Sequence, residues 1–404
     1  MSAHSRAAPA RAAPADAEDK SPEVADGAII AFRLFDIAYA IDLARAEALW
    51  ASSAPSGHSR RASRSRLSAT PPKAVAFGVP PVLLTFDPVA LDLDGTVVEA
   101  GVTARLYDFG VVSFALRVPV ANLPWAGFVA RLNTVDRVVG PGSATGIWDT
   151  LLGQVRTVLG AALERAEASF PQTPLGAAST LEEDYLVGVV TAFPGNPTAA
   201  ELLRTIDLVP LLSGDTRALS DGARADLLRQ RYSYFTDDLV VLTWDRAFIY
   251  EPRGDGDVMD VIEVANAQLL EMRYYDELLD SELPRMYDLV QTARRTRSQF
   301  GANRFANLAR GLYTLVAEVT ELTEKVDNAL QVTEDVYLAR IYSAALELFR
   351  VRLVSAAVER KLAIIRDTYT ALYDEASSRR GELMELLIIL LIAAEIVLAL
   401  VRHG

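Results

Sequence analysis

The sequence contains no cysteine, three histidines and four lysines among its 404 residues. Without cysteine there are no disulfides, thiolate nucleophiles or cysteine-ligated metal centres. None of the histidines (His4, His58 and His403) lies in a segment that is typical of a packed core. A catalytic triad, a histidine-ligated metal or a haem therefore has almost no residues to use. The sequence predicts a protein that is not an enzyme, and we assign no catalytic residue, cofactor or metal ligand.

Basic charge is also scarce relative to acidic charge, because 40 Lys and Arg face 53 Asp and Glu. The resulting net charge of −13 argues against nucleic acid as a partner, since binding to a phosphate backbone needs a basic surface. Hydrophobic residues make up 51% of the chain, which is enough to bury a substantial core.

Composition and periodicity divide the chain into four parts. Residues 1–27 are rich in Ala, Pro and charge without periodicity, and they predict a disordered tail. Residues 28–252 carry strand and helix patterns and predict an α+β domain, interrupted by a flexible basic linker over 52–72. The order of strand, helix and strands occurs around 28–120 and again around 185–250, which suggests an internal duplication of a mixed or antiparallel sheet.

The segment 257–378 has almost no Gly or Pro, and it predicts a helical stalk. Three helices are expected, over about 258–297, 303–330 and 334–376, with apolar residues at spacings of three and four. Such apolar stripes need a partner surface, so we expect an antiparallel bundle or a coiled coil that joins copies of the chain.

The apolar run near the C-terminus predicts a transmembrane helix over 383–402. Glu395 lies inside this run and is expected to face a neighbouring helix in an oligomer. No secretory signal precedes the run, so the rest of the chain is expected on the cytoplasmic side of an inner membrane.

Two readings apply to the basic linker, which carries Arg60, Arg61, Arg64 and Arg66 and no acid. The first is a flexible connection without a binding role. The second is a contact with anionic lipid headgroups, where each cation near the surface contributes about 1 kcal/mol.

A strand that ends in Asp92-Leu93-Asp94-Gly95-Thr96 resembles the first motif of haloacid-dehalogenase phosphatases. That resemblance implies that Asp92 is the nucleophile and Asp94 the general acid of a Mg²⁺-dependent phosphatase. The same residues are also typical of a β-hairpin, because an Asp-Gly turn often joins two antiparallel strands.

Three segments resemble the Rmd/YagE family, named for a requirement in meiotic nuclear division. They are Leu106–Phe114, the stretch from Val326 to Leu362, and the terminal helix from Glu382 to Leu400. The resemblance implies a membrane-associated protein with a C-terminal membrane helix and no established catalytic residues. The Ala- and Arg-rich composition suggests a bacterial member.

These observations predict a membrane-anchored, non-enzymatic scaffold that oligomerises through its helical stalk. The expected partners are membrane lipid, further copies of the chain and an unidentified protein. Two alternatives remain open at this point: a transport-related oligomer that uses Glu395, and the phosphatase that uses Asp92 and Asp94.

Overall fold

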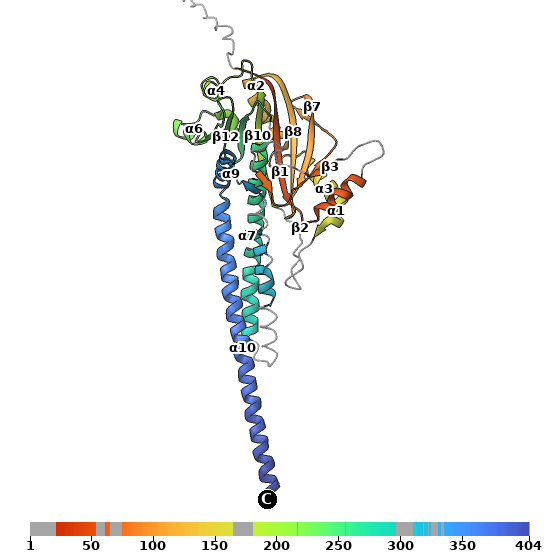
Figure 1. Cartoon of the computed structure of the whole chain (residues 1–404), viewed down its shortest axis with the longest axis vertical. Helices are drawn as coiled ribbons and strands as arrows, with labels where there is room; N and C mark the ends of the chain where they lie inside the picture. The colour runs from red at the N-terminus through yellow and green to blue at the C-terminus, as the bar shows by residue number, and fades with distance from the viewer. Residues whose placement is uncertain are drawn as a thin grey trace, which may run out of the picture.

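The computed structural model describes most of the chain between residues 22 and 403. The described residues are 22–53, 61–64, 75–164, 181–215, 217–254, 256–295, 310–317, 319–321, 323–324, 330–332 and 335–403. They form an α+β protein in which a large sheet packs between two groups of helices, and one long helix leads away from it (Figure 1).

The main sheet has ten strands, with β1 (Glu23–Asp36) near its centre between β8 (Val111–Pro124) and β10 (Glu182–Ala192). Its order is β11-β12-β13-β10-β1-β8-β7-β5-β3, and β6 pairs with β7 off this path. The remaining strands are β3 (Ala62–Arg64), β5 (Val82–Thr85), β6 (Val89–Leu93), β7 (Thr96–Leu106), β11 (Gln230–Tyr232), β12 (Leu239–Leu242) and β13 (Arg246–Tyr250). Two small sheets pair β2 (Ala40–Ile41) with β9 (Leu163–Glu164), and β4 (Val75–Phe77) with β14 (Leu330–Val332).

Strand β1 is apolar on both faces because both faces of the sheet are covered. Ile30 and Phe32 belong to the core on the side of the long helices, whereas Ile29 and Ala31 belong to the core on the opposite side. Alternate residues of a strand point to opposite faces, so one nearly continuous apolar run serves both cores.

Short helices cover the face of the sheet to which Ile29 and Ala31 point, opposite the long helices. They are α1 (Leu43–Ser52), α2 (Trp125–Val139), α3 (Ile147–Leu159), α4 (Ala199–Thr205) and α5 (Val209–Ser213), followed by the exposed α6 (Asp221–Leu227) and a short 3-10 turn at Gly160–Ala162. The apolar positions of α2 recur at helical spacing, and Phe128 and Leu132 are fully buried against the sheet.

Long helices cover the second face and form the stalk. Helix α7 (Asp257–Arg295) packs along β1 and β10, and it also contacts α9 (Val336–Leu348) and α10 (Val351–His403). The single helix expected over 334–376 is interrupted, because Arg350 has a φ of 58° between α9 and α10. That left-handed residue ends one helix and lets the next leave in a new direction.

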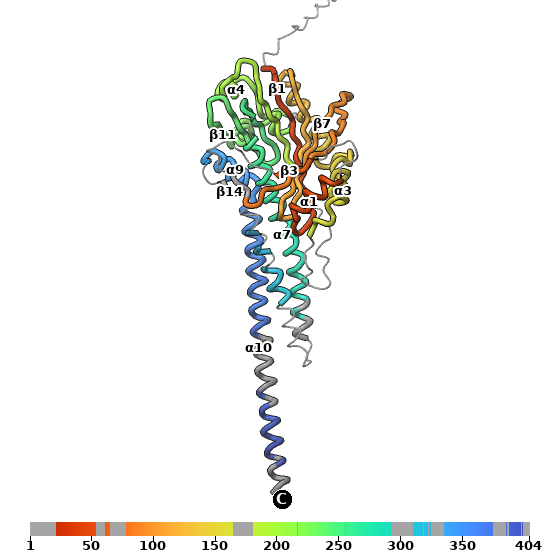
Figure 2. The backbone as a smooth tube through the Cα atoms, turned by 45° about the vertical axis from the view of Figure 1, so that its right-hand side comes forward, coloured from red at the N-terminus to blue at the C-terminus, as the bar shows by residue number. Residues whose placement is uncertain are grey.

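The far part of α10 extends beyond the other elements, as two views show (Figures 1 and 2). Within the part of the chain that the structure describes, no helix combines the length and apolarity needed to cross a membrane. The predicted transmembrane helix over 383–402 is therefore wrong, and these residues are the end of the stalk helix. The physical reason is the position of the carboxylates: only nine residues separate Glu385 from Glu395, whereas a span needs about 20 predominantly apolar residues.

The two halves of the sheet are not built alike. Strand β1 pairs antiparallel with β8, whereas β10 pairs parallel with β13. The suggested internal duplication therefore has no counterpart in the strand pairing. Strand β1 also begins at Glu23, so the sheet starts earlier than the expected domain boundary at residue 28.

Asp335 caps the start of α9, and its loss should weaken the junction between the sheet and the stalk. Its carboxylate accepts hydrogen bonds from the backbone N–H groups of Tyr337 (2.9 Å) and Leu338 (3.1 Å). We expect Asp335→Ala to lower the free energy of unfolding by about 1 kcal/mol, measured by urea denaturation. Asp335→Asn retains a capping oxygen and should lose much less; equal losses in both variants would contradict the capping role.

Candidate functional site

A buried cation joins the sheet to the start of α7. The Arg105 guanidinium, on β7, donates through Nη1 to Glu263 at 2.6 Å and through Nη2 to Asp260 at 2.7 Å. Asp260 and Glu263 lie one turn apart on α7 and present both carboxylates to the same side. Only 11% of the Arg105 side chain and 6% of the Glu263 side chain are exposed, so these charges are largely removed from water.

Burial and charge act in opposite directions on this cluster. Burial lowers the pKa of Arg105, but the nearby carboxylates of Glu263 and Asp260 outweigh that effect and hold the pKa well above its ordinary value. Burial raises the pKa of Glu263, and the Arg105 guanidinium partly offsets this increase. Each charge therefore depends on the other for its stability in the protein interior.

The cluster forms one wall of a cavity of about 420 Å³ between the sheet and the first turns of α7. Strands β1, β5, β7 and β8 supply its floor, and Met259, Asp260 and Glu263 supply the helix side. The floor combines apolar side chains such as Ile30 and Phe32 with hydroxyl groups and small residues. Cavities of a few hundred Å³ that are mostly apolar with a few polar groups are typical of small-molecule sites.

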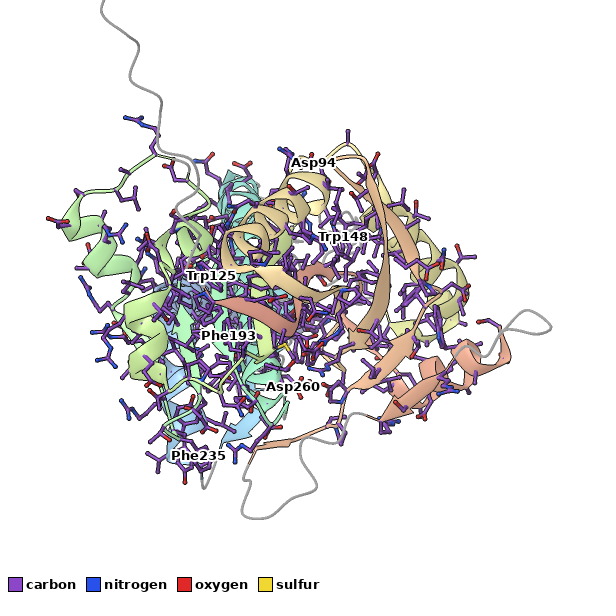
Figure 3. The ribbon with its side chains drawn as sticks, turned by 90° about the horizontal axis from the view of Figure 1, so that it is seen from above. Asp94, Trp125, Trp148, Phe193, Phe235 and Asp260 are labelled. Carbon is purple, nitrogen blue, oxygen red and sulfur yellow. The ribbon has the colours of Figure 1, made fainter. Side chains whose placement is uncertain are left out.

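Asp92 lies near the end of β6, and Asp94 lies in the turn between β6 and β7, away from Asp260 and the cavity (Figure 3). Asp94 and Gly95 both have positive φ angles, and the Asp92 carboxylate accepts the Gly95 N–H at 2.7 Å. Asp94 pairs with Arg137 of α2 at 2.7 Å and accepts the Thr134 hydroxyl at 2.9 Å. Each carboxylate thus has a local structural role, in the turn or in the contact with α2.

Of the four arginines in the basic linker, the structure describes Arg61 and Arg64. Arg64 lies in β3, where it pairs with Glu47 of α1 at 3.1 Å and donates to the Pro80 carbonyl at 3.3 Å. Arg61 is exposed directly before β3. Arg60 and Arg66 lie outside the described residues.

Glu395 lies exposed in the far part of α10, within a group of exposed aliphatic residues. The group, called here the apolar end of α10, consists of Ile388, Ile389, Leu390, Leu391, Ile392, Ile396 and Leu398, each 51–68% exposed. The carboxyl group of Glu395 thus interrupts an otherwise apolar surface.

Among the described residues, no group of three or more acidic or histidine side chains is placed to hold a metal ion. The cavity could not be recognised directly in the sequence, because Arg105 and Glu263 are separated by 158 positions. One signal was available: Glu263 interrupts the buried run Val261–Ala267 of α7 and therefore needs a cationic partner.

Comparison with known proteins matches the sheet region of the chain. The family model described as "Uncharacterized protein MJ0711, N-terminal domain" matches residues 26–256, which is more than half of the chain. Uncharacterized protein MJ0711 of Methanocaldococcus jannaschii is 29% identical over 196 residues, covering 48% of this chain and 59% of the archaeal protein. The chain thus spans less than two thirds of that relative's length. No solved structure gives a significant match.

Proposed function

We propose that this chain, which belongs to the family of the MJ0711 N-terminal domain, is a non-enzymatic scaffold or interaction protein. In this proposal, copies of the chain assemble through the stalk. The sheet domain would present a surface to a protein partner, and the apolar end of α10 would join the copies. The membrane anchor and the membrane location depended on the transmembrane helix, so neither is part of this proposal.

The exposure of the apolar end of α10 carries the proposal. Residues 388–392 are five consecutive exposed aliphatic residues, and each successive residue is rotated by about 100° around the helix. The apolar surface therefore surrounds the helix, and a single neighbouring helix would leave part of it in water. Burying such a side chain fully stabilises a complex by about 1.5–3 kcal/mol, which favours a bundle of at least three copies.

Glu395 fits this arrangement as a contact between helices. In a bundle of identical helices, the Glu395 carboxyl groups would approach one another, and protonation or a hydrogen bond would reduce their repulsion. A single polar residue in an apolar interface is a known way to fix helix register.

We also propose that the chain is related to the Rmd/YagE family. The support for this relationship is the order of the three segments, of which the last, from Glu382 to Leu400, contains the apolar end of α10. The segments Val326–Leu362 and Glu382–Leu400 follow the region that the MJ0711 family model matches, so the two relationships concern mainly different parts of the chain.

The oligomeric mass of the full chain tests the proposal. We expect the 43.9 kDa chain to sediment as a trimer or larger assembly, and Leu390→Glu with Ile392→Glu to weaken association at least 100-fold. Leu353→Glu is the matched control, because Leu353 is 66% exposed on the same helix but lies at the opposite end, next to its first residue Val351. A monomeric wild type at about 100 μM, well above the micromolar dissociation constants of modest complexes, would contradict the proposal.

A further inference from the structure

The cavity beside α7 remains open because the sheet floor under it is made of small side chains. Gly101, Thr103 and Ala115 lie on one face of β7 and β8, where Gly101 is paired with Arg117 and Thr103 with Ala115. A Cβ atom added at Gly101 would meet no other atom within 4 Å. The sheet therefore leaves room here that the side chains of α7 do not fill.

The two cations that line the cavity differ in how their charge is balanced. Arg105 is bound by both Asp260 and Glu263, two acidic groups for one guanidinium, so it has no positive charge left to offer a ligand. Arg117 is exposed at the edge of the cavity, and it forms no ion pair with any residue that the structure describes. One positive charge is thus available next to an apolar surface.

The apolar surface is continuous with this free charge. Ile30 of β1 is the register partner of Arg117, and Phe32 is the partner of Ala115. Phe86 and Pro88 close the side of the cavity formed by the connection after β5, and Met259 closes the side formed by α7. A ligand that fills this space would contact aliphatic and aromatic carbon along its length and a guanidinium at one end.

We propose that the cavity binds a small organic acid with an apolar body, whose anionic group pairs with Arg117. The apolar body lies on the floor of Gly101, Thr103 and Ala115, against Ile30 and Phe32. The hydroxyl groups of Thr85 and Thr103 line the same space and can hydrogen-bond to polar atoms of the ligand. This site is independent of the assembly through α10.

Two fluorescent probes of similar shape test the proposal in the full chain. One is 1-anilinonaphthalene-8-sulfonate, an apolar anion, and the other is N-phenyl-1-naphthylamine, its uncharged analogue. We expect Arg117→Gln to weaken binding of the sulfonate about ten-fold and to leave the uncharged probe unchanged, because only the sulfonate pairs with the guanidinium. Arg352→Gln, at an exposed position of α10, is the matched control and should change neither.

Variants that fill the cavity distinguish dye bound in the cavity from dye bound elsewhere on the protein, including at the apolar end of α10. Ala115→Trp and Gly101→Leu each place a larger side chain in the open space and should remove the same saturable part of the binding of both probes. Circular dichroism checks that each variant is folded, and Gly101→Leu decides the question if the tryptophan is not tolerated. Unchanged sulfonate binding in a folded cavity-filling variant would overturn the site. Equal effects of Arg117→Gln on both probes would overturn the assignment of an anion.

Discussion

Replacing Arg105 by methionine is expected to lower the free energy of unfolding by about 3–5 kcal/mol. The substitution retains a long apolar side chain but leaves Glu263 and Asp260 without the cation that they both bind. Glu263 is 5% exposed, so its carboxylate would be left largely out of contact with water and without a cation. Urea denaturation followed by circular dichroism measures the loss.

A second substitution distinguishes the loss of the ion pair from the loss of packing. Arg105→Met combined with Glu263→Gln removes the buried negative charge as well, and it should recover most of the lost stability. Arg137→Met is the matched control at the surface, because the Arg137–Asp94 pair is 64% and 67% exposed and should contribute at most about 1 kcal/mol. If Arg105→Met cost no more than Arg137→Met, the buried cluster would not stabilise the fold.

The sequence was informative where periodicity reflects burial. The apolar run from Ala28 predicted a strand, and the scarcity of Gly and Pro after residue 257 predicted the long helix that begins at Asp257. Both features follow from local chemistry, since an alternating or helical pattern marks the faces that must be covered. The mixture of a large sheet and long helices was therefore correctly predicted.

The transmembrane helix was wrong because composition alone does not identify what covers an apolar surface. The same aliphatic residues suit lipid, a protein core or a helical bundle, and the carboxylates at Glu385 and Glu395 decide how long the apolar stretch is. The break at Arg350 was also missed, because a left-handed residue other than Gly, Asn or Asp leaves little mark in the sequence.

The cavity could not be predicted because tertiary packing creates it. Its walls come from four strands and the start of α7, which are distant in sequence and meet only when the sheet has formed. The small residues Gly101 and Ala115 are unremarkable alone and become informative only when their neighbours across the strands are known. A charged residue within an apolar stretch, such as Glu263, was the available clue.

A second buried carboxyl group lies farther along α7 and should make the stability of the protein depend on pH. Glu271 is 2% exposed and accepts a hydrogen bond from the Tyr275 hydroxyl, which is also buried. Burial raises the pKa of Glu271 well above its ordinary value, and the negative charge of the buried Asp36 raises it further. The hydrogen bond from Tyr275 opposes this increase but does not cancel it.

We expect Glu271→Gln to be more stable than the wild type by on the order of 2 kcal/mol at pH 8. In the unfolded chain Glu271 releases its proton near pH 4.5, its ordinary value, whereas in the folded chain it retains the proton to higher pH. The stability that the neutral carboxyl contributes is therefore fully present below about pH 4.5 and is lost as pH rises through the folded pKa. Glutamine mimics the protonated acid and does not titrate, so the variant avoids that loss.

The measurement is the free energy of unfolding of both proteins between pH 4 and pH 9, from urea denaturation. Groups that are remote from Glu271, including Glu263, are common to both proteins and cancel in the difference. Glu277→Gln, at an exposed position of the same helix, is the matched control for the loss of one carboxylate. A stability difference for Glu271→Gln that stayed constant across this range would show that Glu271 is ionised in the folded protein, with the Tyr275 hydroxyl outweighing the effects of burial and Asp36.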